Sequence, residues 1–266
     1  MTDLHAGFNA TARTARATSG GWPRATVARR EGQRPPERLP IAEVFRSWQG
    51  EGWLTGTEST FIRVAGCNLR CWFCDTPYAS WHAEGESLSV EEVLARVDGL
   101  GCRHVVLTGG EPLLFAGAVP LSQALRGRGH HVTVETAGTV YRPVAGDLMS
   151  ISPKLANSTP PAAIHPRWAA RHERTRHVPE VVRRLTAEYD YQIKFVIDRP
   201  EDCEEVEAYL AGLPTVDRAR VMLMPQATDA VTLAAKETWI KAHCRAHGFG
   251  YCGRKQIEWF GLQRGT

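Results

Sequence analysis

Three of the seven cysteines lie within eight residues, as Cys67, Cys71 and Cys74, with the spacing C-x3-C-x2-C. Tightly spaced thiols favour a metal site over a disulfide framework, and thiolates are the usual ligands of iron–sulfur clusters. A structural zinc ion or an electron-transfer cluster normally takes four protein ligands, so three thiolates leave one metal position open for another molecule. A zinc loop completed by a distant side chain, or chance clustering, is the alternative. No role is predicted for the other four cysteines, Cys102, Cys203, Cys244 and Cys252.

Glycine-rich and polar segments follow two other apolar runs. Gly109-Gly110-Glu111-Pro112 comes after the run 104–108, where glycines allow a sharp turn and a close approach of the backbone to a ligand. Ser152-Pro153-Lys154 ends the run 148–151 and offers a hydroxyl and an ammonium group as donors. Parallel sheets bind ligands at the carboxyl ends of their strands, so we expect both segments to face the cysteine loop. An ordinary turn and a solvated lysine are the alternatives.

The elements that must position these segments alternate between strands and helices after Pro40. The first helix is opened by a capping box formed by Ser89 and Glu92. The expected strands are 41–45, 61–65, 104–108, 131–135, 148–151, 192–197, 220–224 and 256–260, and the expected helices are 89–97, 121–126, 179–189, 201–211 and 231–247. The composition of segment 156–177 predicts that it forms a long, irregular excursion from the sheet. This alternation predicts an α/β fold, a partial (β/α)6 barrel with an extra N-terminal strand.

Length and charge limit the function classes. The 266 residues allow one large domain or two small ones, and no stretch is apolar enough for a membrane helix or a signal peptide. We therefore predict a cytoplasmic protein that interacts with neither membranes nor nucleic acid. The net charge of the whole chain is +3. Residues 1–40 alone carry +4, so residues 41–266 carry −1. This composition predicts a disordered basic leader, 1–40, ahead of one catalytic domain, 41–266, although an organellar transit peptide has a similar composition.

The cysteine spacing after a strand resembles the radical S-adenosylmethionine superfamily. From about Ile41 to the C-terminus, the chain is more narrowly similar to the 7-carboxy-7-deazaguanine synthases. The motifs that carry this similarity are SWQGEG (47–52), FIRVAGCNLRC (61–71), CDT (74–76), TGGEPL (108–113), ETAGT (135–139) and SPK (152–154). Each motif alone is weakly specific, but together they occur in the family's order and each lies near the end of a predicted strand.

The resemblance implies a [4Fe–4S] cluster on Cys67, Cys71 and Cys74, whose free iron binds S-adenosylmethionine. It further implies that one electron from the reduced cluster cleaves this cofactor to methionine and a 5′-deoxyadenosyl radical, which abstracts hydrogen from the substrate. The residues implied as cofactor contacts are Phe73, Cys74, Asp75, Gly110, Glu111, Ser152, Pro153, Lys154 and Gln226, with Glu135 and Thr136 as ribose partners. No catalytic residue is implied beyond the cluster-bound cofactor.

The substrate implied by the resemblance is 6-carboxy-5,6,7,8-tetrahydropterin, which contracts to 7-carboxy-7-deazaguanine with loss of ammonia in queuosine biosynthesis. An anionic pterin needs a cation for its carboxylate and polar groups for its ring. The residues expected to contact it are Trp48, Gln49, Gly50, Glu51, Arg63 and Thr108. Thr76 is implied as a Mg²⁺ ligand, and Thr266 could reach the pterin. Trp48 departs from the family, where a smaller apolar residue is common.

The implied partners are a small-molecule pterin, an electron donor such as flavodoxin or ferredoxin, and a second copy of the chain in a homodimer. Two other functions stay open from the sequence. Another radical enzyme, for example a glycyl-radical activase, would share the cysteine loop and the Gly-Gly-Glu-Pro segment. A non-catalytic iron–sulfur or zinc module would share only the thiols.

Overall fold

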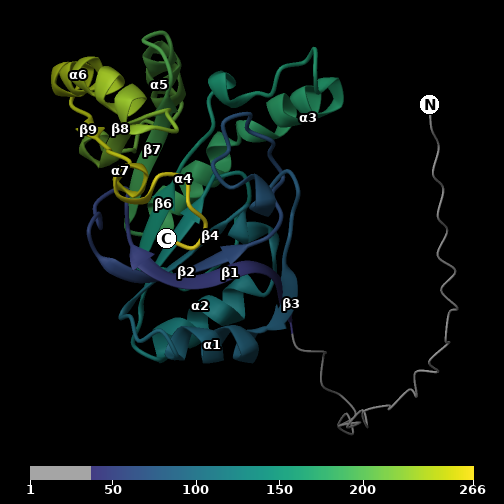
Figure 1. Cartoon of the computed structure of the whole chain (residues 1–266). Coiled ribbons are helices and arrows are strands. Elements are labelled where there is room, and N and C mark those ends of the chain that lie inside the picture. Colours follow the sequence, from purple (N-terminus) through teal and green to yellow (C-terminus); the bar gives the residue numbers. More distant parts are fainter. Residues whose placement is uncertain (1–36) are drawn as a thin grey trace, which may run out of the picture. The chain divides into compact units, whose positions relative to one another are not determined.

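The computed structural model describes residues 37–266, which form one nine-stranded sheet in the order β3-β1-β2-β4-β5-β6-β7-β8-β9 (Figure 1). Strand β1 pairs antiparallel with β2 and β3, and every pair from β2 to β9 is parallel. The strands are β1 (Arg38–Trp48), β2 (Glu58–Val64), β3 (Glu86–Ser89), β4 (His104–Gly109), β5 (His131–Thr136), β6 (Leu148–Ile151), β7 (Tyr191–Ile197), β8 (Val221–Pro225) and β9 (Gly250–Tyr251). This sheet confirms the predicted partial barrel with an additional N-terminal strand.

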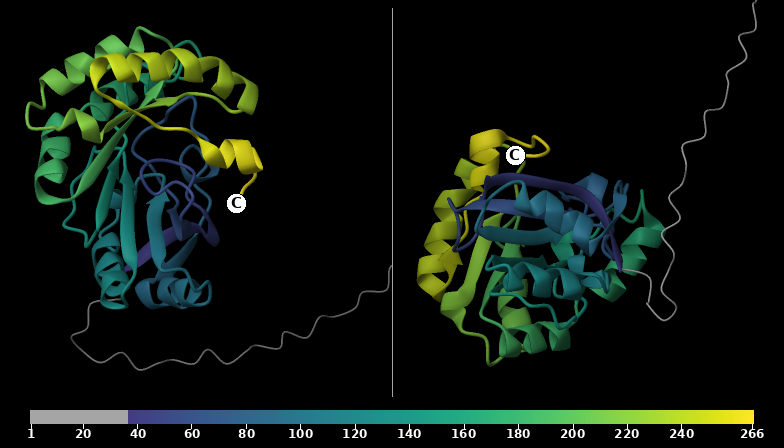
Figure 2. Two further views of the ribbon diagram at one scale, coloured as in Figure 1. Left: turned by 90° about the vertical axis from the view of Figure 1, so that its left-hand side faces the viewer. Right: turned by 90° about the horizontal axis from the view of Figure 1, so that it is seen from below.

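Five helices cover the outer face of the curved sheet, as the two views of Figure 2 show, namely α1 (Val90–Asp98), α2 (Ala118–Gly127), α4 (Pro179–Glu188), α5 (Asp202–Ala211) and α6 (Ala230–His247). The other two helices of the described residues, α3 (Pro166–Arg176) and α7 (Lys255–Phe260), pack on loops at the carboxyl ends of the strands. Helix α1 begins with the predicted capping box, in which Ser89 and Glu92 each accept a hydrogen bond from the other's backbone N–H. Helix α6 begins at the Asp229 side-chain cap and ends at Gly248, whose φ of 74° places it in the left-handed region.

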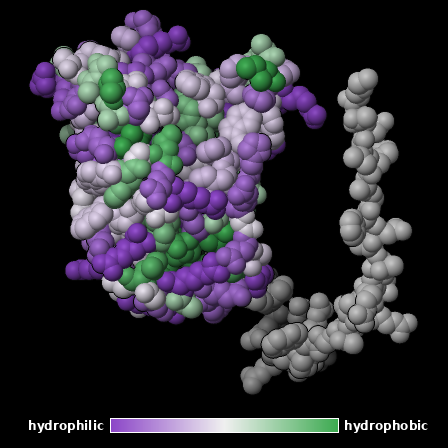
Figure 3. All heavy atoms as spheres, in the orientation of Figure 1, coloured by the Kyte–Doolittle hydropathy of each residue, from purple (hydrophilic) through white to green (hydrophobic). Residues whose placement is uncertain are grey.

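The central strands are buried on both faces because helices lie on one side and the site on the other. All seven residues of β7 are buried, including Gln192 and Lys194. Phe195 of the same strand is fully buried, and its replacement by Ala would cost about 3–5 kcal/mol. On the surface, hydrophilic residues surround separate apolar patches (Figure 3). Among the described residues, no helix is long and apolar enough to cross a membrane.

Three expectations from the sequence need correction. The strand expected at 256–260 is helix α7, in which only Ile257 is buried, and the turn at Gly261 closes the helix with a bond to the Ile257 carbonyl. The excursion expected at 156–177 contains α3, which begins at Pro166, a residue suited to the first helical turn. Strand β1 begins at Arg38, so it includes the last residues of the predicted leader. The rest of the leader, 1–36, lies outside the described residues.

Candidate active site

A cavity of about 290 Å³ lies at the carboxyl ends of β2, β4, β5, β6 and β7. Most residues predicted for the site line it, namely Trp48, Gln49, Gly50, Glu51, Arg63, Cys67, Cys71, Phe73, Cys74, Asp75, Thr76, Thr108, Gly110, Glu135, Thr136, Ser152 and Lys154. The motifs that are scattered along the sequence therefore meet in one place. The last residues of the chain, 261–266, also line this cavity, which brings Thr266 to its wall.

The cysteine loop is held by its own backbone and by aromatic neighbours. Leu69 is buried at the centre of the loop, and Arg70 Nη1 donates to the carbonyl oxygens of Cys67 and Leu69 at 2.7 Å each. Trp81 Nε1 donates to the Cys71 carbonyl at 2.9 Å. These contacts hold the turns that carry the three thiols.

Two glycines after β4 let this strand end pack directly on the cysteine loop. Gly109 has a φ of 128°, and a Cβ atom there would lie 2.3 Å from the Val64 carbonyl oxygen. A Cβ atom on Gly110 would lie 2.1 Å from the carbonyl oxygen of Gly66. The backbone N–H of Gly110 donates to Val64 O at 3.0 Å, and that of Glu111 donates to Gly66 O at 2.9 Å. Any side chain at these glycines would separate the two segments.

The thiol environment fits an iron–sulfur cluster. All three cysteines are free, and burial raises the pKa of the Cys67 and Cys71 thiols to about 12, so a bound metal must supply the positive charge that keeps them ionised. The backbone N–H of Leu69 donates to Cys67 Sγ at 3.4 Å. Within residues 37–266, no three His, Cys, Asp or Glu side chains stand close enough to hold one metal ion. Three free thiols on one loop are the donor set that an iron–sulfur cluster takes.

Three predicted cofactor contacts lie outside the cavity lining. The Glu111 carboxylate is fully buried, where it accepts hydrogen bonds from Thr136 Oγ1 at 2.9 Å and from the backbone N–H groups of Leu113 and Ala137. It ties the end of β4 to the end of β5, and it occupies the hydroxyl of Thr136. Gln226 and Pro153 are also absent from the lining, and the Gln226 carbonyl accepts from Lys236 Nζ at 2.7 Å.

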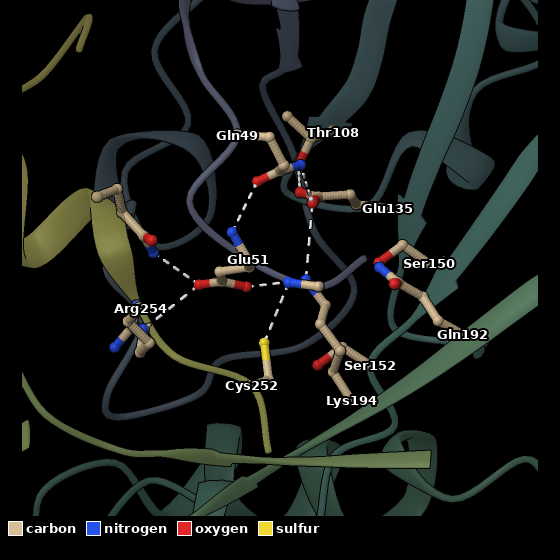
Figure 4. A network of polar contacts seen from close by, with 12 residues as sticks. Gln49, Glu51, Thr108, Glu135, Ser150, Ser152, Gln192, Lys194, Cys252 and Arg254 are labelled. Carbon is tan, nitrogen blue, oxygen red and sulfur yellow. Dashed lines mark hydrogen bonds and ion pairs between the residues drawn. The ribbon is translucent and has the colours of Figure 1, made fainter. Parts of the chain in front are cut away.

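A charged network forms a second part of the cavity wall (Figure 4). Glu51 lies at its centre, with Lys194 Nζ at 2.8 Å, Arg254 Nε at 3.3 Å and Gln256 Nε2 at 2.7 Å from its carboxylate oxygens. Burial alone would raise the pKa of Glu51, but Lys194 and Arg254 outweigh burial and lower it to about 2. The two carboxylates near Lys194, on Glu51 and Glu135, raise the pKa of its ammonium group above the ordinary value despite burial. Glu51, Lys194 and Arg254 are therefore ionised at neutral pH.

Glu135 joins this network to the strand ends. Its carboxylate accepts from Gln49 Nε2 at 3.2 Å and from Thr108 Oγ1 at 2.7 Å, and Lys194 Nζ lies 3.7 Å away. The Gln49 side-chain oxygen in turn accepts from the Glu51 backbone N–H at 3.1 Å. The predicted substrate residues Gln49, Glu51 and Thr108 are thus held in fixed orientations at the cavity wall.

Arg63 enters the cavity from β2 with part of its guanidinium free. Its Nε donates to Glu43 Oε1 at 2.6 Å, and Tyr78 OH donates to the same oxygen at 2.7 Å. Within the described part of the chain, neither Nη atom of Arg63 has a hydrogen-bond partner. Two parallel N–H donors are the arrangement that binds a carboxylate in bidentate fashion.

Two neighbouring groups complete the wall beside the thiols. Lys154 Nζ donates to Ser152 O at 2.8 Å and to Ser152 Oγ at 2.7 Å, which holds the ammonium group over the cavity. Arg254 Nη2 donates to Asp75 at 2.6 Å and Nη1 donates to the Ala227 carbonyl at 2.7 Å. Arg254 therefore connects the cysteine loop to Glu51.

Three residues of the network, Lys194, Arg254 and Gln256, were not predicted from the sequence. Lys194 had a signal that could have been used, since it is the one charged residue in the apolar run YQIKFVI. A lysine in a buried strand needs a carboxylate partner. Arg254 and Gln256 had no signal, because 256–260 was expected to be a strand, whereas helix α7 turns Gln256 toward Glu51.

Comparisons with known proteins agree with this fold and site. The radical SAM superfamily model matches residues 61–187, which run from β2 through α4 and include the cysteine loop. A 7-carboxy-7-deazaguanine synthase of Rhodopirellula baltica is 48% identical over 229 residues, which cover 86% of this chain and 89% of that protein. One from Halobacterium salinarum is 44% identical and covers 82% and 89%, respectively. The crystal structure of QueE from Escherichia coli superposes with a TM-score of 0.63 at 26% identity, over 81% of this chain and 93% of that one.

The fold and the cysteine loop thus define a radical SAM protein. At this level of identity and coverage, the chain belongs to the 7-carboxy-7-deazaguanine synthase family. Membership in the superfamily implies a [4Fe–4S] cluster and S-adenosylmethionine as cofactors.

Proposed function

We propose that the protein converts 6-carboxy-5,6,7,8-tetrahydropterin to 7-carboxy-7-deazaguanine and ammonia, a step of 7-deazapurine and queuosine biosynthesis. The observation that carries this proposal is the meeting of two unlike groups in one cavity, three free thiols on one side and the network around Glu51 on the other. A protein-activating enzyme would need an open surface for a polypeptide. The polar wall of a cavity of about 290 Å³ suits a small, charged heterocycle.

Cys67, Cys71 and Cys74 would hold the cluster, and the Gly110 backbone, Ser152 and Lys154, which line the same cavity, would contact the amino acid part and ribose of the cofactor. When bound, the cluster and S-adenosylmethionine supply a 5′-deoxyadenosyl radical, which is the oxidising group for hydrogen abstraction. The Lys154 ammonium places positive charge beside the cavity for the cofactor's carboxylate. Phe73, which also lines the cavity, offers a flat apolar surface to the adenine.

The network would bind and orient the pterin. The free Nη atoms of Arg63 match the substrate carboxylate, and Gln49, Glu51 and Thr108 match the donors and acceptors of the ring. Lys194 and Arg254 keep Glu51 ionised and fixed, so it accepts hydrogen bonds from the pterin without first reorganising. Residues 261–266 cover part of the cavity and exclude water from the reacting ring.

We further propose Mg²⁺ as a third bound group. The Thr76 hydroxyl lines the cavity beside Cys74, at 3.8 Å from its sulfur. Magnesium retains several waters and favours oxygen ligands, so one hydroxyl would hold it only together with substrate oxygens. The remaining expectations are a homodimer, a one-electron donor protein such as flavodoxin or ferredoxin, and a cytoplasmic location, where seven free thiols would stay reduced.

Anaerobic incubation of the reconstituted, reduced protein with 6-carboxytetrahydropterin and S-adenosylmethionine tests the activity. Liquid chromatography with mass spectrometry should detect 7-carboxy-7-deazaguanine, with many products formed per enzyme. Cleavage of S-adenosylmethionine without this product would instead indicate a different radical enzyme. Absence of iron and sulfide from the protein would leave only a non-catalytic thiol site.

A further inference from the structure

Helix α3 (Pro166–Arg176) presents an unpaired basic stripe. Arg167, Arg171 and Arg174 are spaced four and three residues apart, so they lie on one face of the helix, and all three are exposed. Within residues 37–266, none of the three has a carboxylate partner, whereas most other arginines in that range form an ion pair with Asp or Glu. Long cationic side chains that stay unpaired on one face form a concentrated positive patch.

This helix is built onto the cysteine loop (Figure 1). The backbone N–H of Arg70 donates to His172 Nδ1 at 3.1 Å, and His172 Nε2 lies 2.8 Å from Ser158 Oγ. Burial lowers the pKa of His172 to about 4, so the imidazole is neutral and can accept at Nδ1. The Arg70 guanidinium also lies over the Trp168 ring, at 4.3 Å from its centroid. A molecule on the stripe would therefore be separated from the cysteine loop by little more than α3 itself.

Aromatic side chains connect the stripe side to the thiols. Trp81 donates to the Cys71 carbonyl and lies 6.5 Å from Trp168, centroid to centroid. Trp72, between Cys71 and Cys74, is 48% exposed, and its backbone N–H donates to Ser158 O at 3.1 Å. Trp72 is therefore an exposed aromatic residue bonded to the segment that precedes α3, and protein interfaces combine an aromatic centre with a polar rim.

We propose that α3 and Trp72 form the docking surface for an acidic one-electron carrier protein, with a flavin or an iron–sulfur centre as its redox group. The proposal rests on the proposed function, because it places the electron acceptor on Cys67, Cys71 and Cys74. One electron passes from the reduced carrier to the oxidised cluster, so the carrier loses one electron, the cluster gains one, and no proton or bond is involved.

Charge favours this occupant over a neutral one. The described segment 156–177 contains four arginines and one acidic residue, Glu173, which is already engaged with Arg176 and Thr159. Complementary charge mainly accelerates encounter and orients the partner, and it weakens as salt is added. These are the properties that a transient electron-transfer contact requires.

The test measures binding before turnover. The dissociation constant of oxidised flavodoxin, and separately of a ferredoxin, is determined by calorimetry for wild type and for Arg167→Glu/Arg171→Glu/Arg174→Glu. The matched control, Arg103→Glu/Arg183→Glu/Arg245→Glu, has the same change in charge at three exposed arginines outside α3. We expect the α3 variant to bind at least about tenfold more weakly than the control, and wild-type binding to weaken from 50 to 300 mM salt. The carrier that binds identifies the flavin or iron–sulfur source.

Measuring product formation with two different reductants separates an effect on carrier docking from an effect on catalysis. Product formation driven by the carrier, its reductase and NADPH should fall in the α3 variant, while product formation driven by dithionite stays at the wild-type rate. Equal binding by the two triple variants would overturn the proposal, and so would an equal loss of both activities in the α3 variant. RNA binding is measured for the same variants. If the α3 variant loses RNA binding but binds the carrier as wild type does, the arginines of α3 bind nucleic acid and the proposal is wrong. Failure of wild type with dithionite would instead contradict the proposed function.

Discussion

The two halves of the cavity are built in different ways. The thiol half comes from one short loop and the glycines packed behind it, with Cys67 and Cys74 only seven positions apart in the sequence. The network half joins Glu51 to Lys194 and Arg254, which lie 143 and 203 residues further along the chain. The first half depends on backbone shape and the second on buried charge. We therefore expect the two halves to fail differently when they are altered.

The largest effect is expected at the thiols. Cys71→Ser removes a thiolate ligand that no neighbouring group can replace, so cluster iron and all product formation should be lost. Iron analysis and product assay measure this outcome. The control Cys102→Ser alters a cysteine buried outside the cavity and should keep both. A Cys71→Ser protein with full iron content would show that Cys71 is not a cluster ligand.

The next largest effect is expected at Lys194. Lys194→Met leaves Glu51 and Glu135 without their shared cation, and breaking a buried pair in this way costs about 3–5 kcal/mol. We expect a lower free energy of unfolding, measured with urea, and loss of deazaguanine formation, while the iron content per folded protein stays unchanged.

Lys236→Met is the matched control for Lys194→Met. Lys236 pairs with Asp198 at 2.5 Å outside the cavity, so its replacement should cost some stability and leave pterin turnover intact. Equal losses of turnover in the two variants would show that the network half acts on activity only through global stability.

A smaller, pH-dependent effect is expected at Glu51. Its pKa is about 2 in the folded protein and about 4.3 when unfolded, so its contribution to stability is complete above about pH 5 and disappears as the pH falls toward 2. Glu51→Gln should destabilise the protein by about 3 kcal/mol at pH 7. The difference from wild type, measured by urea unfolding, should shrink steadily below pH 5. A difference that is constant from pH 7 to pH 3 would contradict an ionic role.

The smallest effect is expected at Thr76. Thr76→Ala removes one hydroxyl and should reduce the dependence of product formation on Mg²⁺ by a few-fold, since most ligands of this ion are waters and substrate oxygens. Cleavage of S-adenosylmethionine in the absence of substrate should stay at the wild-type level. If both activities fall together, the hydroxyl supports the Cys74 loop and not a metal.

The same contrast explains which features the sequence could predict. The cysteine loop and the segment Gly109-Gly110 were predictable because short-range spacing encodes a backbone shape, and the strands before them are uniformly apolar. Arg254 and Gln256 were not, because the alternation in QIEWF suits a half-buried strand. Helix α7 is held by long-range contacts, with Gly50 and Glu51 and between Ile257 and Leu233. Glu111 is a motif residue whose position was predictable but whose contacts were not. It was expected to contact the cofactor, and its buried carboxylate instead connects the end of β4 to the end of β5.

One assay tests most directly whether the thiol half of the cavity serves the cofactor and the network half serves the pterin. Wild type, Cys71→Ser and Arg63→Met are each reduced with dithionite and given both substrates, and 5′-deoxyadenosine and 7-carboxy-7-deazaguanine are quantified in the same samples. We expect deazaguanine from wild type, neither product from Cys71→Ser, and 5′-deoxyadenosine without deazaguanine from Arg63→Met. Deazaguanine from Arg63→Met at the wild-type rate, or from Cys71→Ser at any rate, would contradict this expectation.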